Sequence, residues 1–214
     1  MPWIGDVDVR WVFFVAALLA SGCGEAPKEA PKAAKPDHAP ESYRVKFETS
    51  KGDFIVEVTR AWAPRGADRF YELVTSRFYD GVRFHRVLRK FIAQFGVNGN
   101  PKTNELWRQM KILDDKPLEK NRRGTVAFAH LGPTTRTTQV FINLADNRML
   151  DSTNFVPFGK VVEGMDVVDQ ISFLYGELSP KGAGPDPTKT ETLGNDYLQR
   201  EFPRLDWIKR ASIQ

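Results

Sequence analysis

An arginine and a glutamine lie among large apolar side chains in residues 84–96, FHRVLRKFIAQFG. Side chains of an extended chain alternate between two faces, and a bend at residues 89–90 is expected here because the apolar residues do not fit one face. The bend would let three side chains converge: Arg86, Phe91 and Gln94. A guanidinium beside buried aromatic rings costs free energy unless it is paired or bound, so Arg86 is either a structural ion-pair member or a site residue. In a site, it would act as a permanently charged, rigid fork of N–H donors.

The composition bounds the possible functions. The chain has 214 residues, 41% of them hydrophobic, which suits one globular domain with short appendages. One cysteine and three scattered histidines provide neither a disulfide framework nor a metal cluster, so we expect no cofactor and no metal ion. The net charge of +4 comes from basic residues dispersed among acids, so we expect no nucleic-acid partner.

Short strands dominate the body of the chain. Alternating polarity predicts strands at 43–49, 54–58, 84–96, 124–130, 139–144 and 155–162, with Pro157 marking the last as an edge strand or a bulge. Apolar stripes predict one helix that starts near Pro64 and a second over 165–171. We expect a polar loop at 97–121, an irregular segment at 176–194 and a short final helix capped by Asn195. Many strands and two main helices favour a closed or sandwich-like β fold.

The N-terminal segment has the features of an export signal. Residues 11–20, WVFFVAALLA, are too few to span a bilayer but suit the core of a signal peptide. The small residues Ala20, Ser21 and Gly22 precede the lone Cys23, as in the lipobox of bacterial lipoproteins, so we expect a lipid anchor on Cys23. A plain secretory signal and a protein that is not exported are the alternatives. Residues 24–42 are rich in Pro, Ala, Lys and Glu and are expected to be a disordered spacer.

Several ordered motifs resemble the cyclophilin-type peptidyl-prolyl isomerases. They are FHRVLRKFIAQFG at 84–96, GTVAFAHLGP at 124–133, TTQVFIN at 137–143 and LDSTNFVPFGKVVEGMDVVDQI at 150–171. The resemblance implies a mainly β fold, with a closed eight-stranded antiparallel β-barrel capped by two α-helices. It divides the chain into a signal peptide (1–22), a disordered tether (23–42), an isomerase domain (43–175) and a C-terminal loop and helical extension that packs on the barrel (176–214).

The same resemblance assigns roles to individual residues. Arg86 matches the family's catalytic arginine, and Gln94 matches the glutamine that hydrogen-bonds near it; Phe91 completes the catalytic set. Residues matched to the substrate pocket or its rim are Ile92, Ala129, His130, Leu131, Gln139, Phe141, Leu150 and Phe155. His130 stands where the family usually has asparagine. Met149 replaces the tryptophan with which many eukaryotic members contact cyclosporin, so we expect weak cyclosporin binding.

The implied reaction is rotation about X-Pro bonds, with no bond broken. We expect an exported isomerase that acts on unfolded or flexible proline-containing polypeptides, as a monomer on the periplasmic face of a bacterial membrane. His85 is expected to be a core histidine, since the reaction needs no base. The alternative is a non-catalytic module that holds proline-containing segments in the same groove. A sugar-binding β-barrel is a third alternative.

Overall fold

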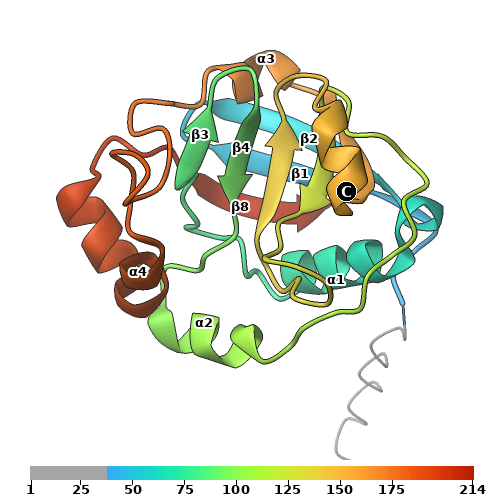
Figure 1. Ribbon diagram of the computed structural model, residues 1–214, viewed down its shortest axis with the longest axis horizontal. Helices are drawn as coiled ribbons and strands as arrows, with labels where there is room; N and C mark the ends of the chain where they lie inside the picture. The colour runs from blue at the N-terminus through green and yellow to red at the C-terminus, as the bar shows by residue number, and fades with distance from the viewer. Residues whose placement is uncertain (1–37) are drawn as a thin grey trace, which may run out of the picture. The chain divides into compact units, whose positions relative to one another are not determined.

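A computed structural model describes residues 38–214, which form one eight-stranded antiparallel sheet with four α-helices around it (Figure 1). The strand order is β3-β4-β6-β5-β7-β2-β1-β8. The strands are β1 (Ser42–Thr49), β2 (Gly52–Thr59), β3 (Arg86–Leu88), β4 (Ile92–Phe95), β5 (Thr125–Phe128), β6 (Val140–Asn143), β7 (Pro157–Glu163) and β8 (Ile208–Ile213). The predicted mainly β, antiparallel architecture is confirmed.

The two edge strands, β3 and β8, are linked only near their ends. An isolated bridge joins Arg83, just before β3, to Trp207, just before β8. The sheet is therefore a curled half-barrel, and its full closure stays a prediction.

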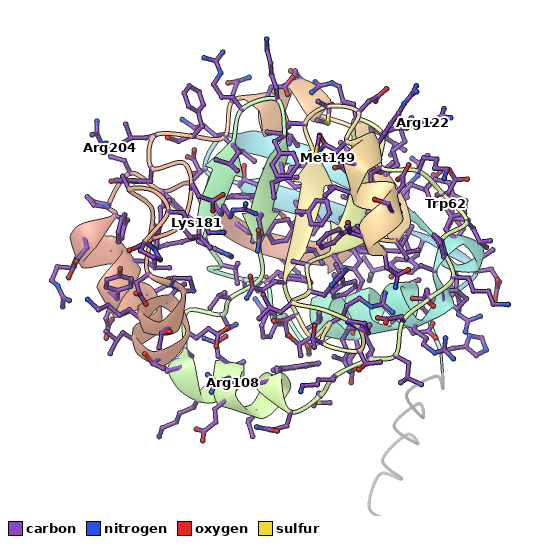
Figure 2. All side chains as sticks on the ribbon, in the orientation of Figure 1. Trp62, Arg108, Arg122, Met149, Lys181 and Arg204 are labelled. Carbon is purple, nitrogen blue, oxygen red and sulfur yellow. The ribbon has the colours of Figure 1, made fainter. Side chains whose placement is uncertain are left out.

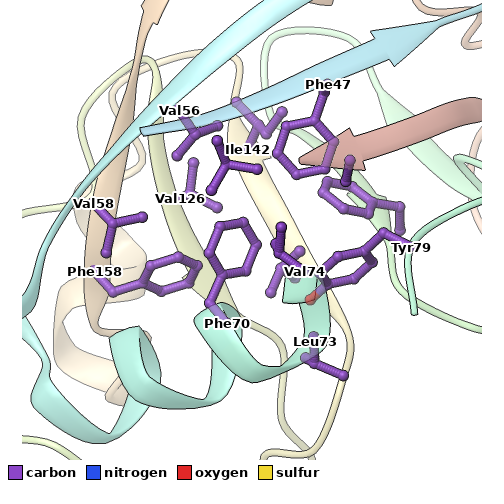
Figure 3. Close-up of a cluster of buried hydrophobic side chains, with 14 of the residues drawn as sticks. Phe47, Val56, Val58, Phe70, Leu73, Val74, Tyr79, Val126, Ile142 and Phe158 are labelled. Atoms are coloured by element: carbon purple, nitrogen blue, oxygen red, sulfur yellow. The ribbon is translucent and has the colours of Figure 1, made fainter. Parts of the chain in front are cut away.

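The first hairpin and the first helix form as the sequence predicts. In β1 and β2 every second residue is buried, and the rings of Phe47 and Phe54 stack with centroids 4.9 Å apart. Helix α1 (Pro64–Thr75) begins with proline at its first turn and buries Phe70 and Leu73 in the main core. The Phe70 ring points from the helix toward Val126 and Phe158 of the sheet (Figure 3). The second predicted helix, α3 (Met165–Asp169), lies at the opposite end of the sheet from α1 (Figure 1).

Strand β7 is central, so the prediction of an edge strand was wrong. It pairs with β2 on one side and β5 on the other. Proline lacks the N–H that a ladder needs, and the sheet accommodates Pro157 with a register shift opposite Val126 and Ala127. The alternative prediction of a bulge is therefore confirmed.

Residues 97–121 are not simply a loop. They contain α2 (Pro101–Arg108), for which the Asn100 side chain accepts a hydrogen bond from the backbone N–H of Lys102 at 3.0 Å. Further along, the buried Asp115 accepts hydrogen bonds from the backbone N–H groups of Arg65 and Gly66, both at 3.0 Å. The residue before α1 is Ala63, which has no capping side chain, so Asp115 supplies the cap from a distant segment.

The C-terminal segment is part of the sheet and does not only pack on it. Strand β8 pairs with β1 from Val45–Ile213 to Thr49–Ile208. The helix before it, α4 (Pro187–Glu201), begins after Asp186, whose side chain accepts from the backbone N–H of Lys189, and is interrupted at Gly194. The predicted short final helix is present as the part of α4 that follows Gly194, although the non-helical residue before it is Gly194 and not Asn195. The helical segment that begins at Pro187 was not predicted.

The last residues of the predicted disordered tether are ordered. Ala39 is buried, and its backbone N–H donates to Asp68 at 2.9 Å. The rest of the tether, the signal peptide and Cys23 lie outside the described residues. Between residues 38 and 214, no helix combines the length and the apolarity needed to cross a bilayer.

Candidate active site

Four neighbouring strands place three of the predicted site residues, Arg86, Gln94 and Phe141, on one face. Arg86 of β3 pairs with Gln94 of β4, Gln94 pairs with Phe141 of β6, and Phe141 pairs with Ala127 of β5. Residues directly opposite each other in antiparallel strands share a face, so these four side chains form a row across the sheet. Alternate positions, Val87, Ala93, Ile142 and Val126, belong to the main core on the other face. The alternation of each strand therefore separates the site from the core.

The bend predicted at residues 89–90 is the tight turn of a hairpin. Strands β3 and β4 pair from Arg86–Gln94 to Leu88–Ile92, and the backbone N–H of Phe91 donates to the Leu88 carbonyl at 3.0 Å. Lys90 adopts a φ of 55°, which turns the chain back on itself. As predicted, this geometry brings Arg86 and Gln94 together.

A chain of hydrogen bonds links the polar side chains of the row. Arg86 Nη1 donates to Gln94 Oε1 at 3.1 Å, and Gln94 Nε2 donates to Gln139 Oε1 at 2.9 Å. Gln94 is buried, whereas the Arg86 side chain remains 22% exposed. The buried glutamine holds one terminal nitrogen of the guanidinium, and the partial exposure of the arginine side chain leaves it accessible to solvent or a ligand.

A second apolar cluster lies beside this polar chain, separate from the main core. It contains Phe91 and, except for Leu131, all the apolar residues that were matched to the pocket: Ile92, Ala129, Phe141, Leu150 and Phe155. Ala127 is also part of it. The Phe141 and Phe155 rings meet edge to face at 5.5 Å, and Phe155 stacks on His130 at 4.2 Å. An apolar wall bordered by charged and amide groups suits a ligand with a small apolar ring next to a polar group. The ring would pack on the wall, and the polar group would face the hydrogen-bonding side chains.

Leu131 and Met149 lie apart from this cluster. The Leu131 side chain is 100% exposed, and its backbone N–H donates to the Thr135 hydroxyl at 2.9 Å. Met149 is 70% exposed on the 3-10 helix that follows β6 (Figure 2). The structure therefore places both residues at a rim, and contact between the Leu131 side chain and a substrate stays a prediction.

Sequence reasoning missed Glu177, which forms a bidentate ion pair with Arg86. Its carboxylate oxygens accept from Arg86 Nε and Nη2, each at 2.6 Å. The loop that carries Glu177 and Lys181 lies beside β3 (Figure 2). The arginine is thus an ion-pair member and a residue of the candidate site at once, two readings that the sequence presented as alternatives.

His85 occupies a buried position behind the site, as predicted for a core histidine. Burial lowers its pKa from 6.5 to about 4, although contacts with the Arg83 backbone and the Gln139 side chain oppose the shift. The unfolded chain therefore binds a proton between pH 6.5 and 4 that the folded chain does not. The free energy of unfolding should therefore fall as the pH falls from 6.5 to 4, and His85 should account for about 1.4 kcal/mol of this fall per pH unit. Above pH 6.5 His85 is neutral in both states, so it causes no loss of stability there.

Urea unfolding at pH 7.0 and 4.5 tests this expectation on the wild type and a His85→Gln variant. Glutamine cannot take up a proton, so the variant should lose less stability between the two pH values than the wild type. An equal loss in both proteins would show that His85 does not remain neutral in the folded state.

Comparison with known proteins agrees with this geometry. The family model described as cyclophilin type peptidyl-prolyl cis-trans isomerase/CLD matches residues 44–189. The chain belongs to the cyclophilin-type peptidyl-prolyl isomerase family. It is 37% identical to a peptidyl-prolyl cis-trans isomerase of Acinetobacter baylyi over 141 residues, which cover 63% of this chain and 74% of the relative.

Other cyclophilins show the same relationship. The peptidyl-prolyl cis-trans isomerase A of Dickeya dadantii is 35% identical over 150 residues, covering 67% of this chain and 76% of the relative. In fold, the chain resembles the crystal structure of a cyclophilin-type isomerase of Cryptosporidium parvum, with a TM-score of 0.59, 23% identity and coverage of 81% and 98% of the two chains. The chain is thus a cyclophilin-type isomerase of peptidyl-prolyl bonds.

Proposed function

We propose that Arg86 lowers the barrier to X-Pro rotation by stabilising the twisted amide. Resonance gives the peptide C–N bond a rotation barrier of about 18–20 kcal/mol. In the twisted state the prolyl nitrogen becomes pyramidal and gains a lone pair, which a charged N–H donor can stabilise. Since the planar amide lacks that lone pair, the donor favours the transition state over the ground state. Lowering the barrier by about 7 kcal/mol would accelerate rotation roughly 10⁵-fold.

The observation that carries this proposal is the border between the polar chain and the apolar cluster. Arg86 and Gln94 lie in the same sheet row as Phe141, so a proline ring against Phe141 would place its amide within reach of the guanidinium. Gln94 and Gln139 would orient the arginine and the substrate carbonyl. One Cryptosporidium parvum cyclophilin structure was determined in the presence of the dipeptide Ala-Pro, which supports proline peptides as ligands here.

A non-catalytic proline-binding module would use the same groove, and rate measurements separate the two. In a protease-coupled assay with a proline-containing peptide, the full-length protein should raise the cis-to-trans rate above the uncatalysed rate. A protein that binds the peptide without accelerating its isomerisation would support the binding module instead.

We propose further that the isomerase is a bacterial lipoprotein, exported to assist the folding of proline-containing proteins at the periplasmic face of a membrane. The apolar run at 11–20 and the small residues before Cys23 support this proposal.

Labelling with a palmitate analogue tests the anchor in a bacterial host. The wild type should incorporate the label and fractionate with membranes, whereas Cys23→Ser should lose both properties, since no other cysteine is present. Equal labelling of the two proteins would contradict an anchor on Cys23, and soluble wild-type protein outside the cytoplasm would indicate plain secretion.

A further inference from the structure

The guanidinium of Arg86 is held on two sides. An arginine side chain has five N–H donors. Glu177 takes the Nε–H and one N–H of Nη2, and Gln94 takes one N–H of Nη1. Among the contacts of residues 38–214, this leaves one N–H on each terminal nitrogen for a ligand. The carboxylate thus occupies one edge of the guanidinium without using up its donors.

Glu177 is itself fixed by the turn that follows it. Its Oε1 atom accepts from the backbone N–H of Leu178 at 2.8 Å, and its carbonyl accepts from the backbone N–H of Gly184 at 2.7 Å. A Cβ atom at Gly182 or Gly184 would clash with the Glu177 carbonyl, so the turn closes around Glu177 only because both positions are glycine. Hydrogen bonds thus hold both the backbone and the carboxylate of Glu177, so the carboxylate faces Arg86 in a fixed position.

The environment of the Arg86–Glu177 pair favours the charged form of Glu177. The hydrogen bond from Arg86 lowers the pKa of Glu177, against the opposing effect of its partial burial, so the carboxylate is ionised at neutral pH. The two side chains are only 22% and 29% exposed, which limits screening by solvent. A bidentate fork between them is both strong and geometrically specific.

We propose that Glu177 is a positioning residue for isomerisation, which holds the Arg86 fork so that its remaining N–H groups are available to the twisted prolyl amide. The proposal rests on the catalytic role proposed for Arg86. A mobile arginine side chain loses entropy when it orients its donors in each turnover, which raises the barrier. A donor that is already held in place avoids this loss. The competing possibility is that the carboxylate weakens catalysis by neutralising the arginine, and the two predict opposite changes in rate.

Kinetics of the full-length protein on a proline peptide separate these possibilities. Glu177→Ala should lower kcat/KM about tenfold, mainly through kcat, because the orientation of Arg86 matters most in the transition state. Glu177→Gln should fall between the alanine variant and the wild type, since its amide oxygen can still accept one of the two bonds. In an Arg86→Ala background, Glu177→Ala should cause no further loss, because it acts only through the arginine.

A matched control removes a similar fork elsewhere in the chain. Arg123 pairs with both carboxylate oxygens of Asp169, at 3.0 and 2.6 Å, so Asp169→Ala should leave kcat/KM unchanged. Glu177 variants that match or exceed the wild-type rate would overturn the proposal, as would a loss that adds fully to that of Arg86→Ala. A wild-type protein without isomerase activity would instead overturn the catalytic role of Arg86 itself.

Discussion

Replacement of Arg86 by alanine is expected to lower kcat/KM for X-Pro isomerisation about 100- to 1,000-fold, the usual range for removing one preorganised donor. The chain should still fold, because Arg86 is partly exposed and the residual Glu177 carboxylate can be hydrated once its partner is gone. Arg86→Lys should recover only part of the activity, since an ammonium keeps the charge but not the planar fork. The measurement is the protease-coupled rate, together with circular dichroism to verify folding.

Arg123→Ala serves as the control for this experiment. It also removes an arginine from a bidentate pair, but one that is exposed and lies outside the candidate site, so its kcat/KM should equal that of the wild type. If Arg86→Ala retained wild-type activity, electrostatic stabilisation by Arg86 would be wrong, and the apolar slot alone would have to account for catalysis.

The largest expected loss of stability follows from replacing Asp115 by alanine. Its carboxylate accepts from Arg136 Nη1 at 3.0 Å, and both side chains are only 2% exposed. The variant leaves a buried guanidinium short of a partner and removes the cap of α1, so the free energy of unfolding should fall by about 3–5 kcal/mol. Equilibrium unfolding in urea measures this change.

Two further variants test whether burial of the ion pair causes the loss of stability in Asp115→Ala. Glu201→Ala removes an exposed pair with Arg200 and should cost no more than about 1 kcal/mol. Combining Asp115→Leu with Arg136→Met replaces both charges by apolar groups and should be less destabilising than Asp115→Ala alone. A loss for Asp115→Ala as small as that for Glu201→Ala would show that the pair does not anchor the segment before β5.

The site residues on strands could be predicted because β structure alternates with a period of two. Once β4 and β6 are recognised, Gln94 and Phe141 must lie on the face opposite Ala93 and Ile142, and the ordered motifs supply the register. Helix α2 and the first part of α4 were missed for a common reason. Each begins with an Asx-Pro pair, Asn100-Pro101 and Asp186-Pro187, which is equally a turn signal and an N-cap followed by proline at the first helical position.

Glu177 could not be inferred from its surroundings in the sequence. It lies 91 residues from Arg86, within a glycine- and proline-rich segment that resembles an unstructured excursion. The cost of an unpaired arginine among aromatic rings predicted that some partner exists, and several acids were available. Only the packing of the C-terminal turn against β3 determines which one.

The pairing of β1 with β8 affects when the protein can fold. Val45 lies opposite Ile213, so the first and last strands of the described chain are neighbours. A polypeptide that emerges N-terminus first, from a ribosome or a translocation pore, cannot complete this sheet until Ile213 is free. Such long-range pairing slows folding. If the chain crosses a membrane as proposed, this delay would keep it unfolded during translocation and postpone folding until it arrives.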